Sequence, residues 1–237
     1  MIARVIAEVR AYFDDPDPTK KRWGEDSYCL EPMDNSSFCL CDKCRPQYEP
    51  GRSRDSSAHS TYWFRFVNKV AREIKKSHPG KMISTLAYMS HEGLPTGFDL
   101  EDNVIVWFCL FNNRLPFKKG YRRQFERMAE WRERYPERPL GLWLYNTFPL
   151  ETAQNANFKT FPGYFSHKAV EQYQFLKRIN ARAGIVECGI NGALESYMQL
   201  ELLQNPDRTA DELLNEYYSM FGKAAPAMRK FHDLCEK

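Results

Sequence analysis

The fold is decided by residues 62–89, which read YWFRFVNKVAREIKKSHPGKMISTLAYM. The first part carries an apolar residue at every fourth position, as one face of a helix does: Tyr62, Phe66, Val70 and Ile74. This pattern predicts a helix over residues 57–77, which the proline and glycine of the following HPG would end. ISTLAYM, at residues 83–89, is short and apolar and predicts a strand. A helix that leads directly into a buried strand is the repeating unit of parallel α/β proteins.

The same alternation continues on both sides of this stretch. Four more strands are predicted, at residues 27–31, 103–109, 140–146 and 183–188. Further helices are predicted at residues 2–13, around Phe125, Met128 and Trp131, and at 166–181, 191–204, 209–220 and 223–235. Strands that are separated by helices favour parallel βαβ units over an antiparallel sheet.

Five strands preceded by a helix favour an incomplete (β/α)8 barrel of the TIM type. A complete barrel has eight strands, so we interpret these as strands four to eight and expect an upstream barrel segment of the same protein. Residues 1–205 would then belong to the barrel and residues 206–237 to a helical extension packed on it. The alternative is a doubly wound open sheet, although neither GxGxxG nor GxxxxGKS/T follows any strand.

Composition limits the range of partners. A chain of 237 residues with 43% hydrophobic content can bury a substantial core. The net charge of +3 gives no signal for nucleic acid, and the short basic runs lie within helical patterns. No apolar run approaches the ~18 residues of a membrane span, and Met1 leads into a helical pattern rather than a secretory signal. The seven cysteines are an odd number and, apart from a cluster at residues 39–44, are scattered, so they do not resemble a disulfide framework.

Two carboxylates follow the first predicted strand, in the segment YCLEPMDNSSFCLCDKC at residues 28–44. Strand alternation turns Leu30 outward and Glu31 inward, and Asp34 lies three residues further on. Glycoside hydrolysis uses two carboxyl groups roughly 5–9.5 Å apart, a span that Glu31 and Asp34 can meet. We predict them as the catalytic pair and expect the negative charge of one carboxylate, at a partly dry barrel mouth, to raise the pKa of the other.

Three other residues are additional acid or base candidates. His91 and Glu92 follow the strand at 83–89, where a solvated loop is the favoured interpretation. Glu187 ends the last strand. It would form a weaker pair with Glu31, because strands four and eight of a barrel face each other across its interior.

Aromatic side chains form a candidate sugar-binding surface. In LGLWLYN, at residues 140–146, the leucines share one face, so Trp143 and Tyr145 should point into the barrel with Asn146 at the tip. Filling of the barrel core is an equal alternative for Trp143. Three more residues are assigned to substrate binding on the same grounds: Tyr88, Trp107 and Asn112.

The cysteines of CLCDKC have the spacing C-x-C-x2-C, at Cys39, Cys41 and Cys44. Tetrahedral zinc needs four ligands, and Cys29 and His59 are the nearby candidates for the fourth. Reduced or locally bridged cysteines are the favoured interpretation and zinc the alternative. We expect no other cofactor.

These motifs together resemble a bacterial family catalogued as domain of unknown function 4838. The resemblance covers residues 26–235 and lies in the order of MDNSSFCLCDKC, FRFVNKVA, PGKMISTLAY and DNVIVWFC, followed by ALESYMQLELLQNPDRTADELLNEYYSMFGKAAPAM. It implies a TIM barrel related to β-hexosaminidases and α-glucuronidases, with some members acting as endo-β-N-acetylglucosaminidases on N-glycans. It also suggests an exported or periplasmic protein if the N-terminus is missing. Where the family often has W-D-Y, this chain has Trp143-Leu144-Tyr145.

The favoured hypothesis is therefore a retaining, substrate-assisted glycoside hydrolase that acts on a bacterial or host glycan. Glu31 or Asp34 would donate the proton or would steady the N-acetyl group of the sugar. The alternative is a non-catalytic glycan-binding or structural module. A zinc-organised interaction domain is a third hypothesis and rests on the cysteines alone.

Overall fold

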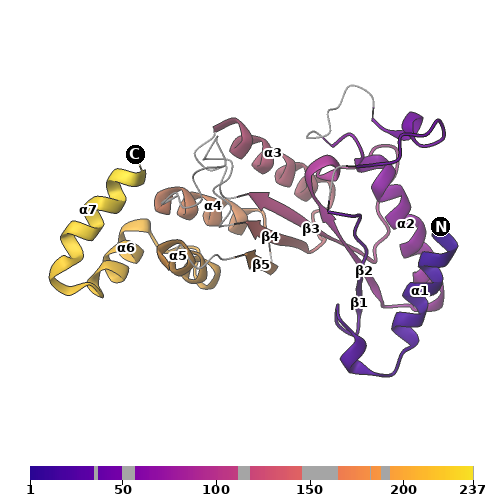
Figure 1. Ribbon diagram of the computed structural model, residues 1–237, viewed down its shortest axis with the longest axis horizontal. Coiled ribbons are helices and arrows are strands. Elements are labelled where there is room, and N and C mark those ends of the chain that lie inside the picture. The colour runs from indigo at the N-terminus through magenta and orange to yellow at the C-terminus, as the bar shows by residue number, and fades with distance from the viewer. Residues whose placement is uncertain are drawn as a thin grey trace. The chain divides into compact units, whose positions relative to one another are not determined.

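The computed structural model describes residues 1–34, 37–49, 57–111, 118–145, 165–181, 183–187 and 193–236. Within them the chain has an α/β architecture in which helices alternate with the strands of one five-stranded sheet (Figure 1). The strands are β1 (Ser27–Cys29), β2 (Met82–Ala87), β3 (Val104–Phe111), β4 (Leu140–Tyr145) and β5 (Ala183–Glu187). All five predicted strands are confirmed, with ends that differ by at most two residues.

The strand order is β1-β2-β3-β4-β5, so each strand neighbours the next one in the sequence. The β1–β2 and β2–β3 pairs are parallel, with Cys29 opposite Ser84 and Leu86 opposite Trp107. A doubly wound sheet reverses its order at a switch point, and the described strands show no such reversal. The order argues against the doubly wound alternative and is the one that consecutive barrel strands have.

Seven α-helices accompany the described strands. They are α1 (Ile2–Asp14), α2 (Ser60–Ser77), α3 (Lys118–Arg134), α4 (Ser166–Arg178), α5 (Ala193–Gln204), α6 (Ala210–Ser219) and α7 (Ala225–Glu236). The predicted helices are thereby confirmed, although α2 begins at Ser60 rather than at residue 57. No helix among the described residues is long and apolar enough to cross a bilayer.

The chain divides into two compact units. Unit 1 contains Met1–Cys109 and Glu130–Gly141, and unit 2 contains Leu110–Ala129 and Leu142–Lys237.

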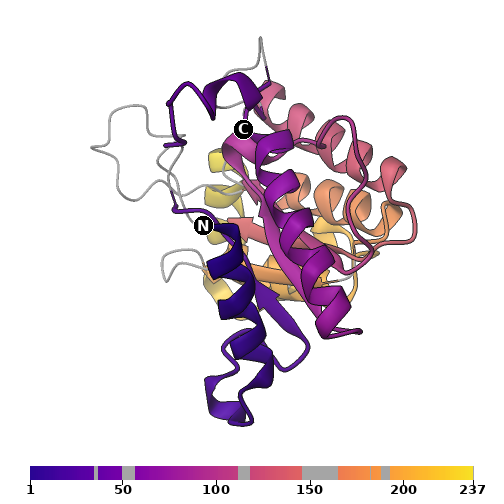
Figure 2. The same cartoon turned by 90° about the vertical axis from the view of Figure 1, so that its right-hand side faces the viewer.

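The core of unit 1 forms around α2, which packs on β2, while α1 lies along α2 (Figures 1 and 2). The buried face of α2 is wider than the predicted stripe, because neighbours contact the helix from more than one side. Tyr62 and Phe66 are only half-buried. The core positions are instead Trp63, Phe64, Val67, Val70, Ala71 and Ile74.

The strands of unit 1 turn alternate side chains to opposite faces of the sheet. Thr85 of β2 faces α2, where its Oγ1 accepts a hydrogen bond from the Trp63 Nε1–H at 3.0 Å. On β3, the half-buried Trp107 lies against Gly141, and a Cβ at position 141 would stand 2.5 Å from Trp107 Cδ2. Glycine therefore makes room for the indole to lie across the first part of β4.

In unit 2, the rest of β4 follows the predicted alternation. Leu142 and Leu144 are buried, whereas Trp143 and Tyr145 are half-buried. The C-terminal helices form a layered group in which α4 packs on α5 and α6, and α6 packs on α7. Thr209 caps α6 with a reciprocal pair of hydrogen bonds to Glu212.

Candidate active site beyond strand β1

Glu31 is a partly buried acid that follows β1 by two residues. The ladder to β2 extends as far as Leu30, whose N–H donates to the Ser84 carbonyl at 2.8 Å, so the strand alternation still holds there. Leu30 is buried, while Glu31 lies on the side of Cys29 and accepts a hydrogen bond from the Cys29 thiol to Oε1 at 3.2 Å. The two side chains therefore lie on opposite sides of the chain, in agreement with the alternation.

Burial raises the pKa of Glu31 from 4.5 to about 8, because the carboxylate would lose its hydration. Hydrogen bonds from the Cys29 thiol and the Leu86 backbone oppose part of this effect. Burial also raises the pKa of Cys29, to about 12, so at neutral pH the thiol keeps its proton and can donate it. At pH 7 Glu31 is consequently a neutral carboxylic acid.

The second carboxyl oxygen of Glu31, Oε2, is the atom from which a proton could be donated. Oε2 is buried and makes no hydrogen bond to any residue that the structure describes. A neutral carboxyl group with one oxygen held by a neighbour and the other unengaged can donate a proton to a substrate atom that reaches it.

Asp34 has a different environment from Glu31, although both were predicted as members of one pair. Asp34 is exposed, in a bend three residues beyond Glu31. The charge of Asp34 is not among the causes that raise the pKa of Glu31. The expectation that a neighbouring carboxylate raises the pKa of Glu31 is thus corrected. The pKa of Glu31 is raised by desolvation, because the protein excludes water from around that side chain.

His91 and Glu92 do not lie in a solvated loop, contrary to the favoured interpretation. Their side chains are 2% and 5% exposed, in and just after a 3-10 turn (Met89–His91) that follows β2. Helix α2 packs against this turn, and the Trp131 Nε1–H donates to the Glu92 carbonyl at 2.8 Å. Gly93 continues the close packing, since a Cβ there would be 2.5 Å from Ser57 Oγ.

His91 is a neutral imidazole inside an aromatic shell. Burial, with a smaller contribution from His59, lowers the pKa of His91 from 6.5 to about 3. Neither ring nitrogen makes a hydrogen bond within the described part of the chain. Its ring centroid lies 5.8 Å from that of Trp63 and 6.3 Å from those of Phe38 and Tyr88.

The loop after β1 folds back onto the start of α2 through aromatic contacts. The Phe38 ring stacks on His59 with centroids 4.0 Å apart and planes 14° apart. Tyr48 meets His59 edge-on at 4.5 Å and Tyr62 at 5.2 Å. Sequence reasoning did not single out Phe38 and Tyr48. The sequence did contain an indication of their role, because these two aromatic residues lie on either side of the cysteine motif.

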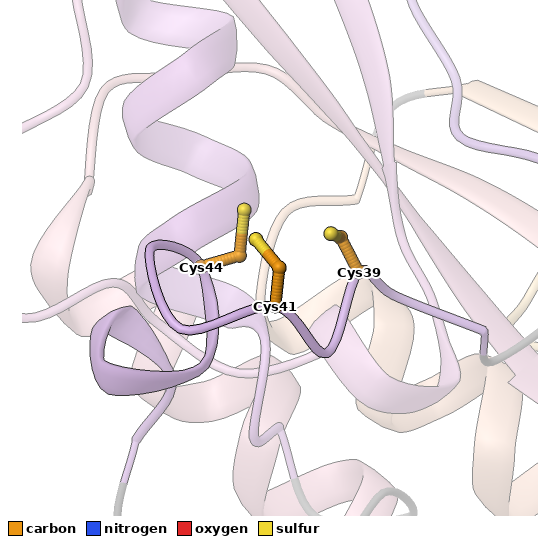
Figure 3. A group of neighbouring side chains, drawn as sticks. All are labelled: Cys39, Cys41 and Cys44. Atoms are coloured by element: carbon orange, nitrogen blue, oxygen red, sulfur yellow. The ribbon is translucent and has the colours of Figure 1, made fainter.

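The three cysteines of this loop converge on one point (Figure 3). Their sulfur atoms all lie within 4.8 Å of one another, and the structure has these cysteines in the free, reduced form. The pKa of Cys41 is lowered from 9.0 to about 7, because its sulfur accepts hydrogen bonds. The donors are the Cys39 thiol and the backbone N–H groups of Cys44 and Lys43. Cys39 and Cys41 are exposed, whereas Cys44 is half-buried with its sulfur 3.5 Å from the Tyr62 hydroxyl.

The described residues that were assigned to substrate binding belong to both compact units. Tyr88 directly follows β2, and its ring centroid lies 6.3 Å from that of His91. Trp107 lies against Gly141, and both residues are in unit 1 with Tyr88. In unit 2 the rings of Trp143 and Tyr145 are stacked, with centroids 6.3 Å and planes 27° apart.

Some of the predicted site lies beyond what the structure describes. Asn112 and Asn146 lie outside the described residues. For Glu187 only the backbone, within β5, is described. The roles assigned to these three residues stay predictions.

Comparison with protein families gives a match over almost the whole chain. The model described as Domain of unknown function (DUF4838) matches residues 2–233. The chain belongs to the DUF4838 family. The match confirms the resemblance seen at residues 26–235 and extends it to α1, so the DUF4838 domain includes the opening helix. No curated protein and no solved structure matches this DUF4838 chain.

Proposed function

We propose that this DUF4838 chain is the C-terminal part of a (β/α)8 glycoside hydrolase barrel, in which Glu31 is the proton donor. The observation that carries the proposal is the state of Glu31. This acid follows a parallel strand, is neutral at pH 7 through burial, and has one buried oxygen without a hydrogen-bond partner among the described residues. The loops beyond the carboxyl ends of barrel strands are where active sites form.

The chemistry requires an acid that can serve twice. In a retaining mechanism, the carboxylic acid first protonates the oxygen of the leaving sugar and then, as a carboxylate, accepts a proton from water. A pKa of about 8 keeps Glu31 protonated for the first step at neutral pH. The Cys29 thiol holds Oε1 and leaves Oε2 to meet the substrate.

Asp34 is proposed as the second group. In a substrate-assisted reaction the N-acetyl oxygen of the sugar attacks the anomeric carbon, and the enzyme supplies a carboxylate that steadies the amide. Asp34 is exposed and follows the same strand end, where an entering sugar can reach it. Trp107, half-buried on β3, is proposed as a ring on which a sugar face stacks.

The barrel itself is part of the proposal. Consecutive strand pairing supports it, and β1 is at the edge of the sheet formed by the described strands. In a barrel this edge pairs with a further strand, because closure leaves no edge unpaired. The upstream segment and a carbohydrate substrate are accordingly proposed partners, and the full-length protein is the form to test.

The test is hydrolysis of aryl β-N-acetylglucosaminides and of a panel of N-glycans by the full-length protein. Glu31→Gln should lower kcat/KM on the order of 10²-fold or more, the usual contribution of a positioned acid. The parent's activity should fall on the basic side with an apparent pKa close to that of Glu31. Glu133→Gln, an exposed carboxamide change on α3, is the matched control and should leave turnover unchanged.

Two outcomes would overturn the proposal. Near-full turnover in Glu31→Gln would remove Glu31 as the acid and direct the search to Glu92 and Glu187. Glycan binding without turnover by the full-length parent would show a binding module instead.

A further inference from the structure

We propose that Cys39, Cys41 and Cys44 bind one zinc ion, which holds the loop that follows β1. The proposal is independent of the glycosidase function, because it rests on sulfur geometry and not on Glu31. Three cysteines supply three of the four ligands of a tetrahedral site.

The distances between the sulfur atoms fit a single metal ion. Zinc–sulfur bonds of about 2.3 Å in tetrahedral geometry place two sulfurs about 3.8 Å apart. All three sulfurs already lie within 4.8 Å of one another, so a shift of about 1 Å or less per pair completes the arrangement. A disulfide needs a sulfur–sulfur distance of about 2.05 Å and would leave the third thiol without a role.

The backbone of the loop positions the sulfurs in the absence of metal. The N–H groups of Cys44 and Arg45 both donate to the Cys41 carbonyl at 3.0 Å, which closes a tight turn between the second and third thiols. The N–H groups of Lys43 and Cys44 also lie against the Cys41 sulfur. Hydrogen bonds of this kind stabilise the negative charge on a metal-bound thiolate.

Tyrosine side chains fix the two ends of the motif. The Tyr48 hydroxyl donates to the Cys39 carbonyl, and the Tyr62 hydroxyl is 3.5 Å from the Cys44 sulfur. The backbone of the first cysteine and the thiol of the last are therefore held by residues from the end of the loop and from α2. Such supporting contacts are typical of the shell around a metal ligand set.

Packing does not account for these cysteines. Reduced cysteine is among the most buried residue types, yet Cys39 and Cys41 are exposed. Three thiols gathered at the surface contribute little to a core, and they are open to oxidation unless something binds them. A bound ion gives their arrangement a chemical reason.

Charge and coordination complete the site. Three thiolates and Zn²⁺ sum to one negative charge, and the exposed Lys43 and Arg45 beside Cys44 can offset it. No other His, Cys, Asp or Glu joins the group within the part of the chain that the structure describes. A water molecule can take the fourth position of the tetrahedron.

The metal would act on the site through Phe38. This residue immediately precedes the first ligand, and its ring stacks on His59 at 4.0 Å. Release of the metal should loosen residues 37–49 and uncover the imidazoles of His59 and His91, which are 5% and 2% exposed in the folded loop.

The first experiment measures metal content in full-length protein purified under reducing conditions without chelator. About one zinc per chain is expected, and replacement by Co²⁺ should give the intense thiolate-to-cobalt absorption of a tetrahedral site. The double variant Cys41→Ser/Cys44→Ser should lose the metal and the cobalt spectrum. Cys235→Ser, a half-buried cysteine of α7, is the matched control and should keep both.

If the double variant fails to fold, zinc binding can still be tested by counting the reactive thiols of the unmutated protein. Added Zn²⁺ should protect three of the seven thiols from a thiol reagent, and a chelator should restore their reactivity. Metal far below one equivalent, together with the same number of reactive thiols before and after addition of Zn²⁺, would overturn the proposal. So would a stable loss of two thiols to a disulfide, or a cobalt spectrum that persists in the double variant. Metal content is read without any glycan, so its failure leaves the glycosidase test unaffected.

Discussion

Replacing Glu31 by glutamine should stabilise the fold at neutral pH while removing the proposed acid. A glutamate ionises near pH 4.5 in the unfolded chain, whereas burial raises the pKa of Glu31 to about 8 in the folded protein. Between these values the unfolded state releases a proton that the native state retains. Raising the pH therefore favours unfolding, by about 1.4 kcal/mol per pH unit.

The size of the effect follows from the two pKa values. Below pH 4.5 both states are protonated and Glu31 imposes no cost. At pH 7 the cost is about 3 kcal/mol, and above pH 8, where the native state ionises too, it levels off at about 5 kcal/mol. Glutamine does not titrate and its oxygen can still accept the Cys29 thiol, so Glu31→Gln should gain most of this energy.

Urea unfolding followed by tryptophan fluorescence between about pH 5 and 9 measures the difference. The free energy of unfolding of the parent should fall relative to Glu31→Gln as the pH rises, and the two curves should converge toward pH 4.5. Glu133→Gln, with its exposed side chain, should follow the parent at every pH. The reasoning is refuted if the Glu31→Gln and parent curves run parallel, or if the variant is less stable than the parent at pH 8.

Substitutions at three further positions test individual contacts of the fold. Gly141→Ala should cost about 1–3 kcal/mol and change tryptophan emission, because the new Cβ meets the Trp107 indole; unchanged stability and emission would contradict this. Thr85→Val should cost about 1–3 kcal/mol by leaving the buried Trp63 N–H without its acceptor, and Thr85→Ser should restore most of it; equal losses in both would argue against the hydrogen bond. Thr209→Ala should cost about 1 kcal/mol through loss of the α6 cap, measured by thermal unfolding, and no loss would mean that tertiary packing alone holds the helix start.

The order of the elements and the buried faces of the strands depend on local sequence patterns, so they could be predicted from the sequence. Each strand is a short apolar run because parallel strands are covered on both faces. In residues 140–145 the alternation of leucine with Trp143 and Tyr145 indicated which side chains would be buried. The approach of the three thiols was also foreseeable in outline, since C-x-C-x2-C places them within six residues of one another.

The chemical state of the site was decided by tertiary structure. Glu31 and Asp34 are both acids after the same strand, and only the packing shows that one is buried and neutral while the other is exposed. His91 was expected in solvent, but Phe38 and Trp63, distant from it in sequence, surround it. Desolvation depends on every group that excludes water from a side chain, and those groups come from segments that local sequence patterns do not connect.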